Sequence, residues 1–122
     1  MTVDNISVIK IRDTLMVTVP TDLDDATISN MQEHILHAME KYNPKGLVLD
    51  LTEVETLDSY FARTVAETAQ MVGLMGGKTI IAGMQPSVAI TATQLGLTMG
   101  AAETALDVDT ALDELGRIDD QE

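Results

Sequence analysis

The sequence predicts a single α/β domain over residues 1–122, with a sheet of four to five strands flanked by about four helices. Short runs rich in Val, Ile and Leu have the length of strands rather than helices. Segments with apolar residues three and four positions apart alternate with these runs, which is the order typical of parallel β-α-β units. A length of 122 residues suits one domain with a sizeable core, and no repeat or linker interrupts it.

The chain begins with a predicted hairpin and a predicted amphipathic helix. Two Val- and Ile-rich runs at 7–11 and 15–19, joined by turn-forming residues, indicate an antiparallel pair. Asp22 and Asp24 are both suitable N-caps for the helix that follows. Apolar residues recur at helical spacing along this helix and predict its buried stripe: Ile28, Met31, Ile35, Ala38, Met39 and Tyr42.

The middle of the chain holds a predicted buried strand and a second helix. Residues 46–51 are almost continuously apolar, as in strands that are covered on both faces. Apolar spacing from Phe61 to Met75 predicts a helix with one buried face. The acidic loop between them brings Ser59 to the start of this helix, where unpaired backbone N–H groups and the positive end of the helix dipole meet.

The last third of the chain continues the alternation, with a strand at 79–83, a helix beginning at Pro86 and a short strand at 102–105. A final helix is expected to be capped by Asp109 and to end at Gly116. Residues 118–122 are expected to form a frayed acidic tail.

Composition excludes several classes of protein. The formal net charge is −13, from 20 acidic and 7 basic residues, and aromatic residues make up 2%. Nucleic-acid binding depends on Lys and Arg at phosphates and on aromatic stacking, so it is not expected, and neither is binding to an anionic membrane. The chain has no cysteine, no apolar run of about 20 residues and no signal-peptide pattern, which predicts a cytoplasmic protein.

Two motif-like segments have better structural explanations. Residues 76–79, Gly-Gly-Lys-Thr, resemble the end of a phosphate-binding loop, but Val72 stands where the first glycine is needed and the segment follows a helix instead of opening one. Residues 22–33 resemble a calcium loop, but Thr27 occupies the position of the turn glycine. Capping and solvation explain these acidic residues better, and no cofactor is expected.

Metal binding and hydrolysis also lack support. His34 and His37 are three residues apart, but no cysteine or clear third ligand accompanies them, so no metal site is predicted. A nucleophile elbow would need glycines two positions either side of Ser59, where Leu57 and Phe61 stand. A Ser-His-acid triad is possible in principle, and no catalytic residue is predicted.

Ser59 could cap the helix, could be a phosphorylation site, or could do both. Spacing alone favours the cap. A phosphate would add about −1.5 to −2 charges beside helix N–H groups that accept anions. It would also meet like charge from Glu53, Glu55 and Asp58. Such a group could alter what the local surface binds.

The segment from Val48 to Ser59 is similar to the central motif of STAS domains, a family that includes bacterial anti-sigma factor antagonists. The likeness covers nearly the whole chain and is closest to the RsbS type, the small single-domain scaffold of the stressosome. Other segments that continue the likeness are 23–25, 76–78, 83–89, 95–96 and 103–107.

The resemblance implies a non-enzymatic scaffold that co-assembles with RsbR-like STAS proteins and sequesters an RsbT-like serine/threonine kinase. It implies that the kinase phosphorylates Ser59 and departs, and that an RsbX-like phosphatase resets the site. Self-association is expected. Asp58, Tyr60 and Arg63 are expected to belong to the partner-binding patch, because they neighbour Ser59.

Two alternatives remain open at this point. One is a SpoIIAA-like anti-sigma factor antagonist that acts by direct partner switching without a large assembly. The more distant one is a small serine hydrolase that uses Ser59 as its nucleophile.

Overall fold

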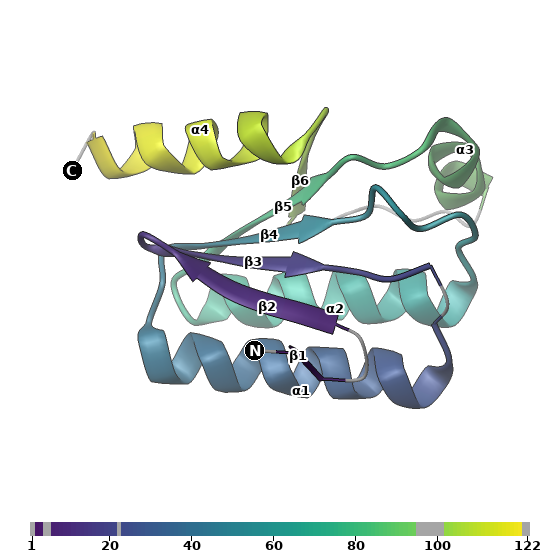
Figure 1. Ribbon diagram of the computed structural model, residues 1–122, viewed down its shortest axis with the longest axis horizontal. Coiled ribbons are helices and arrows are strands. Elements are labelled where there is room, and N and C mark those ends of the chain that lie inside the picture. Colours follow the sequence, from purple (N-terminus) through teal and green to yellow (C-terminus); the bar gives the residue numbers. More distant parts are fainter. Residues whose placement is uncertain (1, 4–5, 22, 95–101, 121–122) are drawn as a thin grey trace.

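A mixed six-stranded sheet is the centre of the protein in the computed structural model, which describes residues 2–3, 6–21, 23–94 and 102–120 (Figure 1). The strands are β1 (Thr2–Val3), β2 (Ile6–Ile11), β3 (Thr14–Thr18), β4 (Gly46–Asp50), β5 (Lys78–Ala82) and β6 (Ala102–Ala105). The helices are α1 (Asp25–Tyr42), α2 (Ser59–Leu74), α3 (Pro86–Gln94) and α4 (Val108–Asp120). The predicted α/β class is confirmed.

The strands follow one another across the sheet in chain order. The pairs β1–β2 and β2–β3 are antiparallel, which confirms the predicted hairpin, and β3, β4, β5 and β6 run parallel. The two-residue strand β1 was not predicted, because so short a segment carries no periodicity. The carboxyl ends of the four parallel strands meet at one edge of the sheet, and each of the four helices begins beyond one of these ends.

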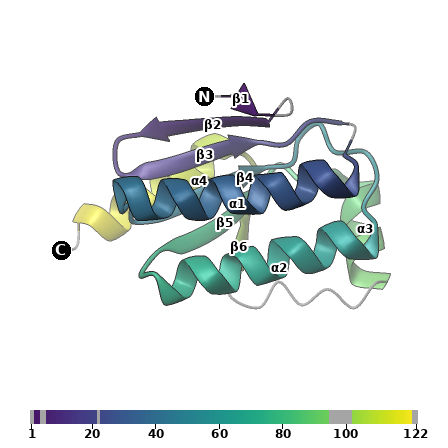
Figure 2. The same ribbon diagram turned by 90° about the horizontal axis from the view of Figure 1, so that it is seen from below.

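The helices form layers on both sides of the sheet. Helices α1 and α2 lie side by side against one face, and α4 covers the other face (Figures 1 and 2). Helix α3 lies beyond the carboxyl edge of the strands (Figure 1). None of the described helices combines the length and the apolar character needed to cross a membrane.

Strands β4 and β5 contribute to two apolar cores. Leu47, Leu49 and Ile81 belong to the main core under α1 and α2. Alternate residues on the same strands belong to a smaller core under α4: Val48, Ile80 and Ala82, with Ala111 and Leu115 from the helix. This burial on both faces explains why residues 46–51 are apolar without alternation.

Aspartates cap helices α1 and α4, as well as α2, whose cap is described with the candidate site. The Asp24 carboxylate accepts a hydrogen bond of 2.7 Å from the Thr27 N–H, and the bond lowers the pKa of this carboxyl. Asp22, the other predicted cap, lies outside the described residues. Asp107 accepts from the Thr110 N–H at 2.8 Å with the same effect on its pKa, so the prediction that Asp109 caps α4 was wrong. Asp109 instead lies in the first turn, where the helix dipole also favours a negative charge.

Predictions at the C-terminal ends of three helices also required correction: Tyr42 and Met75 are not buried, and α4 does not end at Gly116. Tyr42 is 45% exposed and Met75 is 41% exposed, because each lies at the last turn or cap of its helix, beyond the apolar layer. Helix α4 continues through Gly116 to Asp120, since a glycine inside a helix lowers its stability without ending it. The helix thus includes part of the segment expected to be frayed, and residues 121–122 lie outside the described chain.

We expect Leu49→Ala to lower the free energy of unfolding by about 2–5 kcal/mol, because Leu49 is fully buried in the main core and its removal leaves a cavity. Leu74→Ala is the matched control, since Leu74 is 84% exposed, and its effect should stay within about 0.5 kcal/mol. Urea denaturation measures both. Equal losses in the two variants would contradict this arrangement of the core.

Candidate functional site

The candidate site is the loop from β4 to α2, at the carboxyl edge of the sheet. Leu51 and Val54 are almost fully buried, and Leu57 is 8% exposed, so three apolar side chains anchor the loop. The acidic residues between them, Glu53 and Glu55, are exposed. The loop therefore presents a negative outer surface on a fixed apolar base.

Hydrogen bonds from two neighbouring connections hold this loop in place. The Thr21 hydroxyl donates to the carbonyl of Glu53 at 3.0 Å, and the Gln85 side-chain amide donates to the carbonyl of Thr52 at 2.8 Å. The Asp50 carboxylate accepts from both the backbone N–H and the hydroxyl of Thr52. The segments after β3 and β5 thus fix the loop after β4, a contribution that no local sequence pattern indicated.

Gly83 allows the loop after β4 to pass close to the backbone at the end of β5. Its φ of +73° lies in the left-handed region, and a Cβ there would collide with the Thr52 hydroxyl and come within 3.4 Å of the Asp50 carboxylate. Any other side chain would force the loop away from β5.

Asp58 is the N-cap of α2. Its backbone is extended, with φ −102° and ψ 171°, and its carboxylate accepts a 2.8 Å hydrogen bond from the Phe61 N–H. Its carbonyl accepts from the Ala62 N–H at 3.0 Å. Ser59 is therefore the first residue of the helix, and the interpretation of Ser59 as the cap was wrong. Both residue types make good caps, and the position where the loop turns decides between them.

Ser59 is consequently left without a structural hydrogen bond. Its side chain is exposed, and its hydroxyl has no partner in the part of the chain that the structure describes. It lies in the first turn of a 16-residue helix, where the helix dipole favours an added negative charge.

Tyr60 on α2 links this helix to α1. Its hydroxyl and that of Ser29 on α1 are 2.6 Å apart and share a hydrogen bond. Its ring is partly buried against the main core. Tyr60 therefore has a clear positioning role beside Ser59, and its expected role in partner binding stays a prediction.

Arg63 lies one turn after Ser59 on the exposed face of α2. It is the single Lys or Arg between residues 46 and 77 of the sequence. Among the described residues it makes no ion pair. An unpaired guanidinium four residues after an exposed serine is well placed to meet a phosphate on that serine.

A shallow hollow of about 120 Å³ adjoins the cap. It lies between the α1 and α2 N-terminal ends and has an apolar floor that includes Leu57 and Phe61. Asp58 contributes the charge at its rim. The hollow thus lies next to Ser59 and combines an apolar floor with a charged rim.

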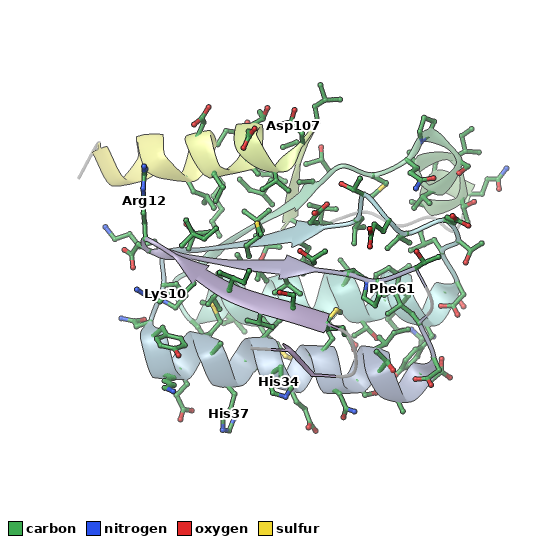
Figure 3. All side chains as sticks on the ribbon, in the orientation of Figure 1. Lys10, Arg12, His34, His37, Phe61 and Asp107 are labelled. Carbon is green, nitrogen blue, oxygen red and sulfur yellow. The ribbon has the colours of Figure 1, made fainter. Side chains whose placement is uncertain are left out.

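Other chemistries find no support in the described part of the chain. No three His, Asp or Glu side chains there come close enough together to hold a metal ion. His34 and His37, the two histidines of the sequence, lie along α1 and well away from Phe61 at the start of α2 (Figure 3). No histidine is therefore placed to activate the Ser59 hydroxyl.

Asp58→Ala should lower the free energy of unfolding by about 0.5–2 kcal/mol, because the Phe61 N–H loses its cap. Ser59→Ala, one residue on, should change it by less than about 0.5 kcal/mol, because its hydroxyl bonds to nothing in the described structure. Thermal and urea unfolding measure the pair. The reverse order of the two effects would return the cap to Ser59.

Known proteins resemble this chain both in sequence and in fold. The chain is 28% identical over 82 residues to the RsbT co-antagonist protein RsbRA of Bacillus subtilis, a match over 67% of this chain but only 30% of RsbRA, so the chain spans less than a third of that relative. A serine-to-glutamate variant of RsbS from Moorella thermoacetica superposes with a TM-score of 0.85 and 29% identity, over 96% of this chain and 99% of RsbS.

A chain from the molecular architecture of the stressosome, described as a signal integration and transduction hub, superposes with a TM-score of 0.81 and 31% identity. The match covers 93% of this chain and 98% of that one. The family model of the STAS domain matches residues 5–111. This protein therefore belongs to the STAS domain family.

Proposed function

We propose that this protein is a non-enzymatic scaffold of a cytoplasmic, stressosome-type assembly. It co-assembles with RsbR-like STAS proteins and holds an RsbT-like serine/threonine kinase. Phosphorylation of Ser59 releases the kinase, and an RsbX-like phosphatase restores the binding surface. The observation that carries the proposal is an exposed serine at the start of α2 whose hydroxyl the described fold does not use, since Asp58 makes the cap.

The division between Asp58 and Ser59 suits a reversible switch. A phosphate on Ser59 adds about −1.5 to −2 charges without removing any hydrogen bond seen in the described structure. The helix N-terminus favours the added charge, while the exposed carboxylates of Glu53, Glu55 and Asp58 oppose it. The phosphate therefore changes the surface far more than it changes the fold.

The likeness to RsbS and RsbRA supports the assembly part of the proposal. The match to RsbS spans almost both whole chains, whereas the match to RsbRA is confined to a part of that protein. The rigid support of the loop by Thr21 and Gln85 presents one fixed surface to a partner, and Arg63 and the hollow beside Asp58 belong to this surface.

We expect incubation with an RsbT-like kinase and ATP to add one phosphate to the chain, measured by intact mass, and to release the kinase in a pull-down. Ser59→Ala should gain no phosphate and should retain the kinase. Ser87→Ala is the matched control, because Ser87 is also exposed in the first turn of a helix, and it should behave as the unchanged chain.

Three results would each point elsewhere. A phosphate that persists in Ser59→Ala would place the modification on another residue. Kinase release that persists in that variant would remove the switch. A Ser59-dependent switch without a megadalton complex in size-exclusion chromatography with the RsbR-like protein would indicate direct partner switching of the SpoIIAA type.

Arg63→Gln should raise the second pKa of a phosphate on Ser59, because the guanidinium one turn away favours the dianion. The expected change corresponds to about 0.3–0.5 kcal/mol, typical of such helix pairs. Phosphorus NMR titration of the phosphorylated chain measures it. Arg12→Gln is the control, since Arg12 lies at the hairpin turn on the opposite edge of the sheet. Equal pKa values in all three chains would exclude this pairing.

A further inference from the structure

A hollow of about 370 Å³ lies between the hairpin and the C-terminal half of α1, apart from the Ser59 surface. The hairpin contributes Val8, Ile9, Lys10 and Leu15, and the helix contributes His34, His37, Ala38, Lys41 and Tyr42. Figure 3 shows Lys10 on the hairpin and both histidines on α1. Lys41 lies 12 residues after Ser29, which contacts Tyr60, or about 18 Å along the helix.

The charge around this hollow is opposite to that of the whole chain. The sequence has 20 acidic residues against 7 basic ones, yet two lysines and both histidines line the hollow, and its described lining includes no Asp or Glu. The ammonium groups of Lys10 and Lys41 lie 6.0 and 5.1 Å from the centre of the Tyr42 ring. Both cations thus lie near the same aromatic ring of the lining.

The floor of the hollow is apolar. Leu15 is buried at 1% exposure, and Val8 and Ala38 are partly buried against the main core. Ile9 and Tyr42 remain 43% and 45% exposed at its rim. An apolar ligand group can therefore cover side chains that water now contacts.

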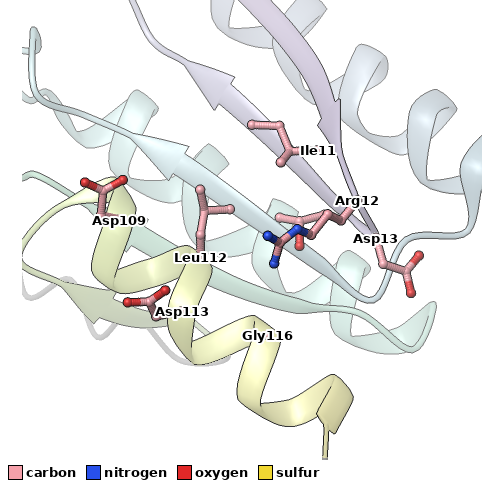
Figure 4. A pocket seen from close by; sticks show the side chains of 8 residues that line it. Ile11, Arg12, Asp13, Asp109, Leu112, Asp113 and Gly116 are labelled. Atoms are coloured by element: carbon pink, nitrogen blue, oxygen red, sulfur yellow. The ribbon is translucent and has the colours of Figure 1, made fainter.

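A second, larger hollow of about 670 Å³ differs in character (Figure 4). It lies between the hairpin turn and α4 and carries Arg12 together with Asp13, Asp109 and Asp113. Among its described lining residues, acidic groups outnumber the basic one, so an anion would be repelled there.

We infer that the hollow lined by Lys10, Lys41 and Tyr42 binds a small amphipathic anion, an unbranched apolar tail with one carboxylate or phosphate head. The tail would lie against Val8 and Leu15, and the head would meet the two ammonium groups. A volume of about 370 Å³ lies within the range of small-molecule pockets, about 300–1,000 Å³. The ligand would bind as a single molecule from solution rather than from a lipid bilayer, because the net charge of −13 opposes approach to an anionic membrane.

The test compares probes that share one tail and differ in the head. Decanoate, decyl phosphate, decanol and decyltrimethylammonium are each titrated below their micelle concentrations into the unphosphorylated chain, followed by methyl NMR and calorimetry. The two anions should shift the methyl signals of Val8, Leu15 and Ala38 and bind about tenfold or more tightly than decanol, since charge-assisted contacts contribute about 1.5–3 kcal/mol. Decyltrimethylammonium should bind least.

Variants locate the site. The double variant Lys10→Gln, Lys41→Gln should bind decanoate about tenfold or more weakly. Ala38→Leu should abolish decanoate binding by filling the hollow. Lys78→Gln, which removes a lysine outside the hollow, and Ala89→Leu, an exposed helical position, are the matched controls and should bind as the unchanged chain. Circular dichroism confirms that each variant is folded.

Three results would overturn the inference. These are equal affinity for decanol and decanoate, signal shifts that map elsewhere, and decanoate affinity that survives in the double lysine variant. Co-sedimentation with phosphatidylglycerol vesicles, but no binding of the free anions, would instead identify a lipid surface and would also contradict it. No kinase takes part, so the outcome is independent of the role proposed for Ser59.

Discussion

Burial of β4 on both of its faces is the constraint on which the rest of the structure depends. Leu47 and Leu49 pack toward α1 and α2, and Val48 packs toward α4. A strand covered on both sides must lie inside the sheet, with β3 and β5 parallel on either side. Parallel pairing then brings the carboxyl ends of the strands to one edge, and the helices that begin there turn their positive N-terminal ends toward the same surface. The location of Ser59 follows from this arrangement.

In the loop before α2, the residues that hold the backbone in place are different from the exposed Ser59. Thr21, Gln85 and Asp50 hold the backbone of the loop, and Asp58 satisfies the N–H of Phe61. Ser59 carries no part of this work in the described structure, so a change at its hydroxyl alters charge at the surface while the scaffold stays in place. A module that must hold one partner, release it and be reset benefits from that separation.

The distribution of the few basic residues gives the protein two different surfaces. Near the start of α2, Arg63 stands alone among exposed carboxylates. Toward the end of α1, Lys10 and Lys41 gather over Tyr42 with both histidines nearby. Because α1 extends between these regions, a group bound at one surface does not cover the other, although both contact the same helix.

Sequence alone determined the elements and their order, apart from the two-residue strand β1. The alternation of apolar runs with helical spacing predicted the hairpin, β4, α2 and β6, because local periodicity reports which face of each element is buried. It also placed Ser59 at the start of α2 and supplied the resemblance to STAS domains.

Tertiary structure decided which of two similar candidate residues caps a helix, and which residues far apart in the sequence come into contact. Asp58 rather than Ser59, and Asp107 rather than Asp109, became caps, because the point where each loop turns into its helix depends on anchoring elsewhere in the fold. The contacts between Thr21 and Glu53 and between Gln85 and Thr52 join residues more than 30 positions apart, as does the pairing of Lys10 with Tyr42. No local pattern encodes such contacts, since they exist only when strand order and helix placement bring separate segments together.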